Sequence, residues 1–149
     1  MSMTGFDVFD RTVQKSNIWL KELGESLHMD EPHDAYLALR TVLHALRDRL
    51  PPEEAAHLAA QLPMLLKGVY YEGWKPGATP VKIRDRQEFL DGMREPLRSR
   101  MPNPDAERIT RGVFELLARH VSAGEIAQIV SGLPPELREL WPAEIGATT

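Results

Sequence analysis

Apolar residues recur along most of the chain at steps of three, four and seven, which is the spacing of one face of an α-helix. The first such stretch covers residues 6–27, and its apolar face is Phe6, Phe9, Val13, Leu20, Leu23 and Leu27. Similar stretches cover residues 35–50 and 106–121, the former with Arg40 and Arg47 turned away from the apolar face. No run alternates apolar and polar residues between turn signals, as a strand would. The pattern predicts an all-α fold of about eight short helices.

Much of the segment 35–74 is repeated 71 residues later, at 106–141. An alignment without gaps pairs identical residues, including Ala35 with Ala106, Arg40 with Arg111, Leu46 with Leu117, Glu54 with Glu125, and Leu62-Pro63 with Leu133-Pro134. The apolar positions keep register over about 36 residues, which is typical of a duplicated structural unit. Because a unit of about 70 residues is only marginally stable alone, we expect two pseudo-equivalent units, related by an approximate two-fold, to pack on a shared core.

Prolines mark the ends of the short helices. Pro63 and Pro134 cannot continue a helix ladder, so each is expected to begin a further helix at an angle to the one before. Leu62 and Leu133 precede these prolines and are predicted to be buried at the two junctions. Ser122 in the second unit is expected to cap the helix that follows it, in a capping box.

A segment rich in glycine and proline, 72–80, is the clearest linker in the chain. We therefore divide the sequence into a first helical unit at 1–74, a linker at 75–84 and a second helical unit at 85–149. Together the units are expected to form one compact domain.

The composition narrows the classes of function. A net charge of −4 gives no bulk attraction to nucleic acid or to an anionic membrane, so we expect neither as a partner. The absence of cysteine excludes disulfides, thiolate zinc sites and cysteine nucleophiles, and it fits a reducing cytosol. The first residues lack the pattern of an export signal and no apolar run is long enough to span a membrane, so we expect a cytoplasmic protein.

Two segments of the sequence carry a family resemblance: ALRTVLHALRDRLPPEEAAHLAAQLPMLLKGVYYEGW and LPPELRELW. They resemble the bacterial family of uncharacterised proteins catalogued as domain of unknown function 2267, over roughly residues 6–141. The resemblance implies a small, all-helical, duplicated domain. It implies no activity, cofactor or catalytic residue.

The spacing Glu-x-x-His, which puts both side chains on one helix face, occurs at Glu25 with His28 and at Glu54 with His57. A pair of such motifs is typical of a di-metal bundle. However, the first pair falls where a helix is expected to end, His57 aligns with Gln128 in the second unit, and no His-x-x-x-His occurs. We therefore expect no metal site.

Signals of catalysis are missing from the sequence. None of the serines sits in a glycine-flanked nucleophile elbow, and no glycine-rich phosphate loop follows a strand. We expect no catalytic residue and no cofactor, and hence a protein that is not an enzyme.

Arg40 and Arg111 occupy equivalent positions in the two units. One interpretation is structural: each pairs with an acid of its own unit, Glu54 and Glu125, which are also repeated. The alternative is an arginine clamp for an anionic ligand, because guanidinium groups bind carboxylates and phosphates in a bidentate manner.

Tyr71 and Trp74 have no counterpart in the second unit and stand where the linker begins. Either they cover the junction between the units, or they form a patch for a partner, since tyrosine and tryptophan dominate binding hot spots. We expect Tyr71 to be largely buried and Trp74 to be partly exposed.

These observations predict a non-enzymatic, cytosolic protein-interaction or scaffolding module that uses a groove or edge where the two units meet. The alternative is a small-ligand or anion-binding regulatory domain that uses Arg40 and Arg111. The predicted partner is another protein, and the sequence indicates no particular oligomeric state.

Overall fold

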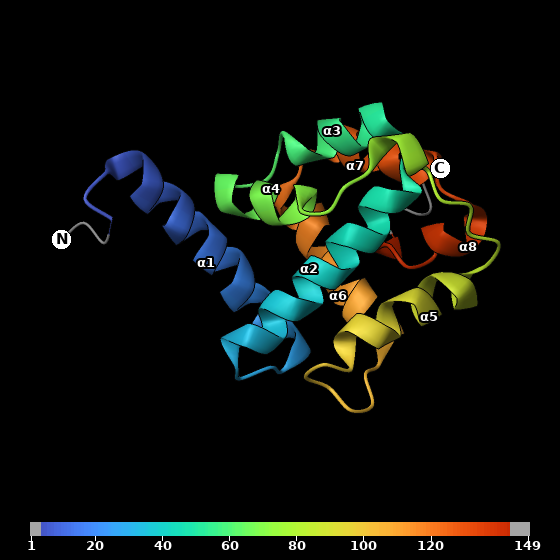
Figure 1. The fold of residues 1–149 in the computed structure, drawn as a ribbon, viewed down its shortest axis with the longest axis horizontal. Helices are drawn as coiled ribbons and strands as arrows, with labels where there is room; N and C mark the ends of the chain where they lie inside the picture. The colour runs from blue at the N-terminus through green and yellow to red at the C-terminus, as the bar shows by residue number, and fades with distance from the viewer. Residues whose placement is uncertain (1–3, 144–149) are drawn as a thin grey trace.

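The structure, a computed structural model, describes residues 4–143 (Figure 1). Within this range the chain forms eight α-helices, one 3-10 turn and no β-strand, so the predicted all-α fold is confirmed. The helices are α1 (Asp7–Leu27), α2 (Pro32–Arg49), α3 (Pro52–Ala59), α4 (Met64–Tyr71), α5 (Arg86–Leu97), α6 (Ala106–His120), α7 (Ala123–Ser131) and α8 (Pro135–Arg138). Among these described helices, none has the length and apolar character that crossing a membrane requires.

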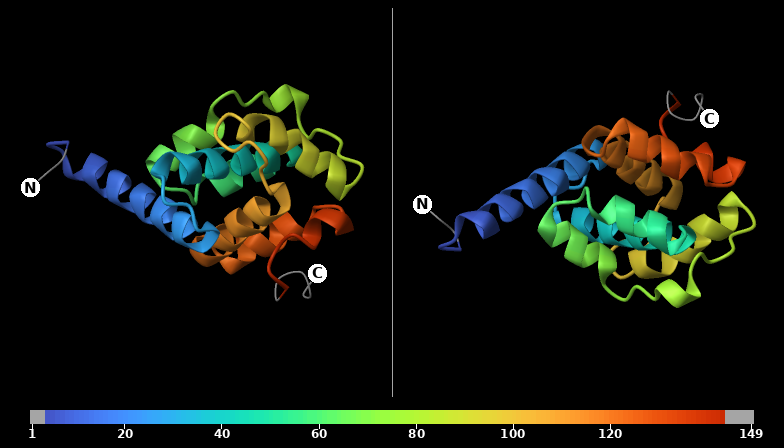
Figure 2. Two further views of the ribbon diagram at one scale, coloured as in Figure 1. Left: turned by 90° about the horizontal axis from the view of Figure 1, so that it is seen from below. Right: turned by 90° about the horizontal axis from the view of Figure 1, so that it is seen from above.

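Helices α2 and α6 pack against each other, and α1 and α5 each contact both of them. On another side of this pair, α3 contacts α7 (Figures 1 and 2). Buried apolar side chains from each of the eight helices form a hydrophobic cluster. Leu46 of α2 and Leu117 of α6 belong to it and are almost completely buried.

Helix α1 extends beyond the body of the molecule at its N-terminal end (Figures 1 and 2). Its C-terminal half packs against α2, α4 and α6, and the buried positions on it are Thr12, Ser16, Trp19, Leu23, Gly24 and Leu27. The predicted apolar face is therefore correct only in part: Phe6 and Phe9 are exposed, and Trp19 is buried against the His120 ring. The reason is that the helix is longer than the body it covers.

The short helices meet at the predicted junctions. Leu62, between α3 and α4, is 5% exposed, and Leu133, between α7 and α8, is 2% exposed, so the burial of both is confirmed. Pro63 and Pro134 each occupy the N-cap position of the next helix, where a missing backbone N–H costs nothing.

Ser122 caps α7 as predicted, because its Oγ accepts a hydrogen bond from the Glu125 N–H at 3.3 Å. The second half of the expected capping box is missing. The Ser122 N–H donates to Gln61 Oε1 at 2.7 Å, so a side chain of the first unit does what Glu125 was expected to do.

The segment between α4 and α5 contains one 3-10 turn, Pro76–Ala78, and crosses back over α2. The Val81 N–H donates to the carbonyl of Asp48, in the last turn of α2, at 2.7 Å. Asp85 then caps α5 by accepting from the Glu88 N–H at 2.8 Å. The division of the chain at this segment stays a prediction.

Helix starts follow the repeat: α3 begins at Pro52 and α7 at Ala123, while α4 begins at Met64 and α8 at Pro135. Both pairs differ by the 71 residues that separate the two copies in the sequence. That the two units superpose remains a prediction.

Candidate functional site

Arg40, His44 and Arg47 lie on one face of α2, because residues three and four positions apart share a helix face. This face meets the C-terminal end of α4. Arg40 Nε donates to Glu72 Oε1 at 3.1 Å, and His44 Nε2 bonds to the carbonyl oxygen of Val69 at 2.7 Å. The end of a helix carries unpaired carbonyls and partial negative charge, so these donors and cations stabilise it.

Two pKa values on this face are shifted. Burial is the main cause that lowers the pKa of His44, with a smaller effect from the charges of Arg47 and Arg40. The hydrogen bond from Arg40, followed by the charge of Arg40, lowers the pKa of Glu72. At neutral pH the ionised Glu72 therefore pairs with the cationic Arg40, and the neighbouring His44 is uncharged.

Arg47 is the buried member of this face, at 4% exposure. Its Nη1 donates to the carbonyls of Tyr70 at 2.7 Å and Glu72 at 2.8 Å, and its Nε donates to Asp48 Oδ1 at 2.8 Å. The expectation that Arg47 points away from the core is therefore wrong. The carbonyls at the end of α4 supply the hydrogen bonds that a buried guanidinium needs.

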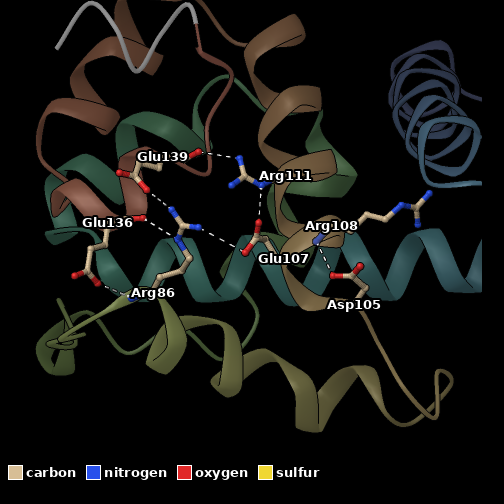
Figure 3. Close-up of polar contacts among 7 residues, drawn as sticks. All are labelled: Arg86, Asp105, Glu107, Arg108, Arg111, Glu136 and Glu139. Atoms are coloured by element: carbon tan, nitrogen blue, oxygen red, sulfur yellow. Dashed lines mark hydrogen bonds and ion pairs between the residues drawn. The ribbon is translucent and has the colours of Figure 1, made fainter.

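Arg111 contacts the end of α8 and a glutamate of its own helix (Figure 3). Its Nη1 donates to the carbonyl of Glu139, directly after α8, at 2.8 Å. Its Nε donates to Glu107 Oε2, one turn earlier on α6, at 3.1 Å. Arg40 and Arg111 thus each bind the C-terminal end of the last helix of their unit.

The predicted pairs Arg40 with Glu54 and Arg111 with Glu125 are wrong. Both arginines have an acid as a partner, but the acids are Glu72 and Glu107. Arg40 is held by the Glu72 side chain after α4, and Arg111 is held by Glu107 and by the carbonyl after α8. The glutamates on α3 and α7 lie beside each other instead.

Arg86, which the sequence did not single out, joins α5 to α8 and α6 (Figure 3). Its backbone N–H donates to Glu136 Oε2 at 2.9 Å, and its guanidinium pairs with Glu139. A longer ion pair of 3.6 Å links it to Glu107. Exposed networks of this kind orient helices while each pair contributes little to stability.

A cavity of about 620 Å³ opens beside this network, with Arg111, Arg138 and Trp141 in its wall. The donors in the wall are largely engaged, since Arg138 Nε donates to the Leu133 carbonyl at 2.8 Å. The side chain of Glu139 adds negative charge to the same wall. Arg40 lines neither this cavity nor a second one that Arg111 lines, so the structure does not bring the two arginines to one ligand.

Glu54, His57 and Glu125 come together where α3 contacts α7. One possible ligand atom of each lies within 4.8 Å of the other two. Burial, then a hydrogen bond to Glu54 and the charge of Glu54, raise the pKa of Glu125 to about 7. The Glu54-x-x-His57 spacing was visible in the sequence, but the partner from the other unit was not. Glu54 and Glu125 are aligned with each other in the sequence repeat, and this alignment is the signal that could have pointed to the pair.

Tyr71 and Trp74 pack on each other with ring centroids 5.2 Å apart, beside the Arg40–Glu72 pair. Both side chains are half-buried against the hydrophobic cluster. Trp74 is partly exposed as predicted, and Tyr71 is partly buried against the core, whereas Tyr70 beside it is completely buried.

Exposed apolar side chains gather where α1 leaves the body. Phe6 and Phe9 are 54% and 51% exposed and contact each other edge to face at 5.1 Å. Met64 and Leu65, at the start of α4, are 55% and 49% exposed. Sequence reasoning placed Phe6 and Phe9 in the core, because a continuous apolar stripe does not reveal where the covering helices end.

Comparison with family models identifies the family of the chain. No curated protein matches the chain. A family model described as "Uncharacterized conserved protein (DUF2267)" matches residues 16–140, which is most of the chain, and the segments that carried the resemblance lie inside this match except for Trp141 at the end of the second one. The chain therefore belongs to the DUF2267 family.

Proposed function

We propose that this chain is a non-enzymatic, cytosolic protein-interaction module that docks through the outer end of α1. The observation that carries the proposal is the buried face of α1, which continues beyond the body as the exposed side chain of Phe9. Phe9 lies three residues before the buried Thr12 and seven before the buried Ser16, so it shares their face of the helix. We call residues 6–11 the α1 arm.

The start of α4 enlarges the apolar surface at the base of the arm. The Leu65 N–H donates to Thr12 Oγ1 at 3.0 Å, which fixes Met64 and Leu65 beside α1. Four large apolar side chains are thus exposed at one end of the molecule, where Figure 2 shows the arm extending outwards. An exposed apolar patch of this kind is typical of a surface that binds another protein.

The occupant that the charges favour is the arm of a second copy of this chain. Asp7 and Asp10 lie in the first turn of α1, and Arg11 and Lys15 follow in the next turns. In an antiparallel pair of arms, the acidic end of one chain lies beside the basic stretch of the other. A two-fold, isologous contact places opposite charges side by side and buries both phenylalanine pairs at once.

The experiment is the measurement of molar mass by light scattering during size-exclusion chromatography, over a range of protein concentrations. The wild type is expected to pass from monomer to dimer, and Phe9→Asp is expected to stay monomeric. The matched control is Ile18→Asp, because Ile18 is 53% exposed on the same helix but lies roughly 200° around the axis from Ser16. A wild type that stays monomeric at every concentration, or a Phe9→Asp variant that dimerises normally, contradicts the proposal.

The surface proposed from the sequence, around Arg40, Tyr71 and Trp74, is the alternative docking surface to the arm. The Trp74→Ala variant separates the two surfaces in the same chromatographic assay. If Trp74→Ala dissociates the dimer while Phe9→Asp leaves it intact, the docking surface is the aromatic patch. The arm proposal requires the opposite order.

A second candidate function is the binding of a small anion at the cavity lined by Arg111 and Arg138, since two arginines belong to the wall of one opening. Isothermal titration with inorganic phosphate tests it. Heat of binding that disappears in Arg111→Ala supports an anion site, and no heat in the wild type removes the candidate. The same titration of Arg40→Ala shows whether the second arginine takes part.

The proposal includes the internal two-fold relation between the units. If a two-fold axis exchanges the two units, α5 takes the place of α1 and α6 takes the place of α2. The α1–α2 contact then corresponds to α5–α6, and the α1–α6 contact corresponds to α2–α5. All four contacts occur. The same exchange leaves the α2–α6 contact and the α3–α7 contact unchanged, and both occur. This pattern supports a shared core in which the two units are pseudo-equivalent, with α1 alone bearing the arm.

A further inference from the structure

The cluster where α3 contacts α7 combines the two ligand types that divalent transition metals bind. Glu54 and His57 are one turn apart on α3, so their side chains share a face. Glu125 reaches them from the first turn of α7. Imidazole nitrogen and carboxylate oxygen together favour such metals as zinc.

The buried oxygens of this cluster have no donor. Glu54 Oε1 and Glu125 Oε2 are shielded from solvent, and neither accepts a hydrogen bond within the described residues. The nearby Tyr70 hydroxyl does not supply one, since it donates to the carbonyl of Ala55 at 2.8 Å. Across residues 4–143, no lysine or arginine forms an ion pair with either glutamate. Two carboxylates facing each other in this way repel each other unless a cation or a shared proton lies between them.

We propose that Glu54, His57 and Glu125 bind one divalent transition-metal cation, with Zn²⁺ as the best-fitting ion, and that the metal joins α3 to α7. Two metal–ligand bonds of about 2.1 Å span at most about 4.2 Å, close to the separation of the ligand atoms. His57 is exposed, so its ring turns without displacing the core. Three protein ligands leave one tetrahedral position for water. This proposal is independent of the α1 arm.

The test is a titration of the full chain with Zn²⁺ alone, after removal of bound metal with a chelator. We expect one zinc per chain in isothermal titration and a zinc-dependent rise in melting temperature. Glu125→Gln and His57→Gln should each weaken binding by at least about tenfold, which corresponds to about 1.4 kcal/mol. His57→Gln is conservative, because the second unit carries Gln128 at the aligned position.

Two controls make the result specific. Glu53→Gln removes a neighbouring exposed carboxylate of α3 and should leave zinc affinity unchanged. His120→Gln removes a different histidine, whose Nε2 lies 2.7 Å from Glu22 Oε2, and should also bind zinc normally. A loss of affinity in His120→Gln with none in His57→Gln overturns the proposal in favour of an adventitious surface site.

The alternative state of the cluster is a proton held between the two carboxyl groups. In that case Zn²⁺ binds the wild type no more tightly than Glu125→Gln, and the proposal is overturned. The melting temperatures of the metal-free variants show whether each variant is folded. Glu125→Gln should have a melting temperature equal to or above that of the wild type, because it removes a carboxylate that faces another. A variant that is folded and still loses zinc affinity supports the site.

Discussion

At the scale of the residue, buried polar groups are found where helix ends supply partners. Arg47 is nearly inaccessible to solvent, yet its guanidinium donates to the carbonyls of Tyr70 and Glu72 and to the carboxylate of Asp48. These bonds replace the hydration that the cation and the last carbonyls of α4 lose on folding. Removing one member of such a group leaves the others buried without partners.

Arg47→Met should therefore destabilise the protein by about 3 kcal/mol. The thioether fills much of the volume but donates no hydrogen bond to the two carbonyls. Urea unfolding followed by circular dichroism measures the change, with Arg98→Met as the control, because Arg98 is exposed and its contact with Glu95 is 3.9 Å long. Equal midpoints for the two variants would show that the guanidinium bonds are dispensable.

The Arg40–Glu72 pair predicts a pH dependence. The pKa of Glu72 is lowered from its ordinary value of 4.5, so the folded state holds this proton less tightly than the unfolded state. The pair therefore stabilises the fold above pH 4.5, and the contribution is lost as the pH falls through the lowered pKa of the folded state. Glu72→Gln should flatten this acid limb of the melting curve between pH 3 and 7. The effect is small, since Glu72 is exposed. Parallel pH profiles for variant and wild type would contradict the assignment.

At the scale of the element, proline-marked junctions were predictable and the environment of the charged residues was not. Leu62 and Leu133 are buried as the Leu-Pro spacing predicts, because a proline forces the chain to turn at a fixed place. Helix periodicity located α1, α2 and α6, and prolines marked the starts of several short helices. Neither signal could tell that α1 extends beyond its neighbours or that Arg47 is buried. Both depend on where other helices end, which local sequence does not encode.

The junction residues should carry much of the stability of the short helices. Leu62→Ala and Leu133→Ala are each expected to cost about 2 to 5 kcal/mol, since each leaves a cavity under a helix boundary. Ile18→Ala is the control, because the Ile18 side chain is exposed. Thermal melting compares the three variants. Junction variants with the same melting temperature as the control would mean that the prolines alone, without the buried leucines, fix the helix boundaries.

The same scale explains why the repeated glutamates were assigned wrong partners. Glu54 and Glu125 recur at equivalent positions, as do Arg40 and Arg111, and pairing within each unit was the simplest interpretation. The contact between α3 and α7 instead brings equivalent residues of the two units together. A repeat tells which residues are equivalent, but only the packing of the units tells which of them meet.

At the scale of the whole molecule, the body and the arm differ in how they place their apolar side chains. The helices from α2 to α8 and the inner half of α1 bury a hydrophobic cluster, whereas the arm exposes Phe6 and Phe9 to solvent. Aromatic residues exposed on an extended helix leave apolar surface in contact with water in a monomer, and an assembly can bury that surface. The proposed dimer covers them without any change in the body, so association should leave the helix content unchanged.

The most direct test of this account measures the distance between arms of two chains. The protein contains no cysteine, so Val8→Cys gives a single labelling site on the arm, and Ser99→Cys gives a comparison site on the turn after α5. Double electron–electron resonance of spin-labelled protein should give a short, well-defined distance between two labels at position 8. The labels at position 99 should give a much longer distance or none. A position 8 sample without dipolar coupling, at concentrations where the protein is dimeric, would contradict docking through the α1 arm.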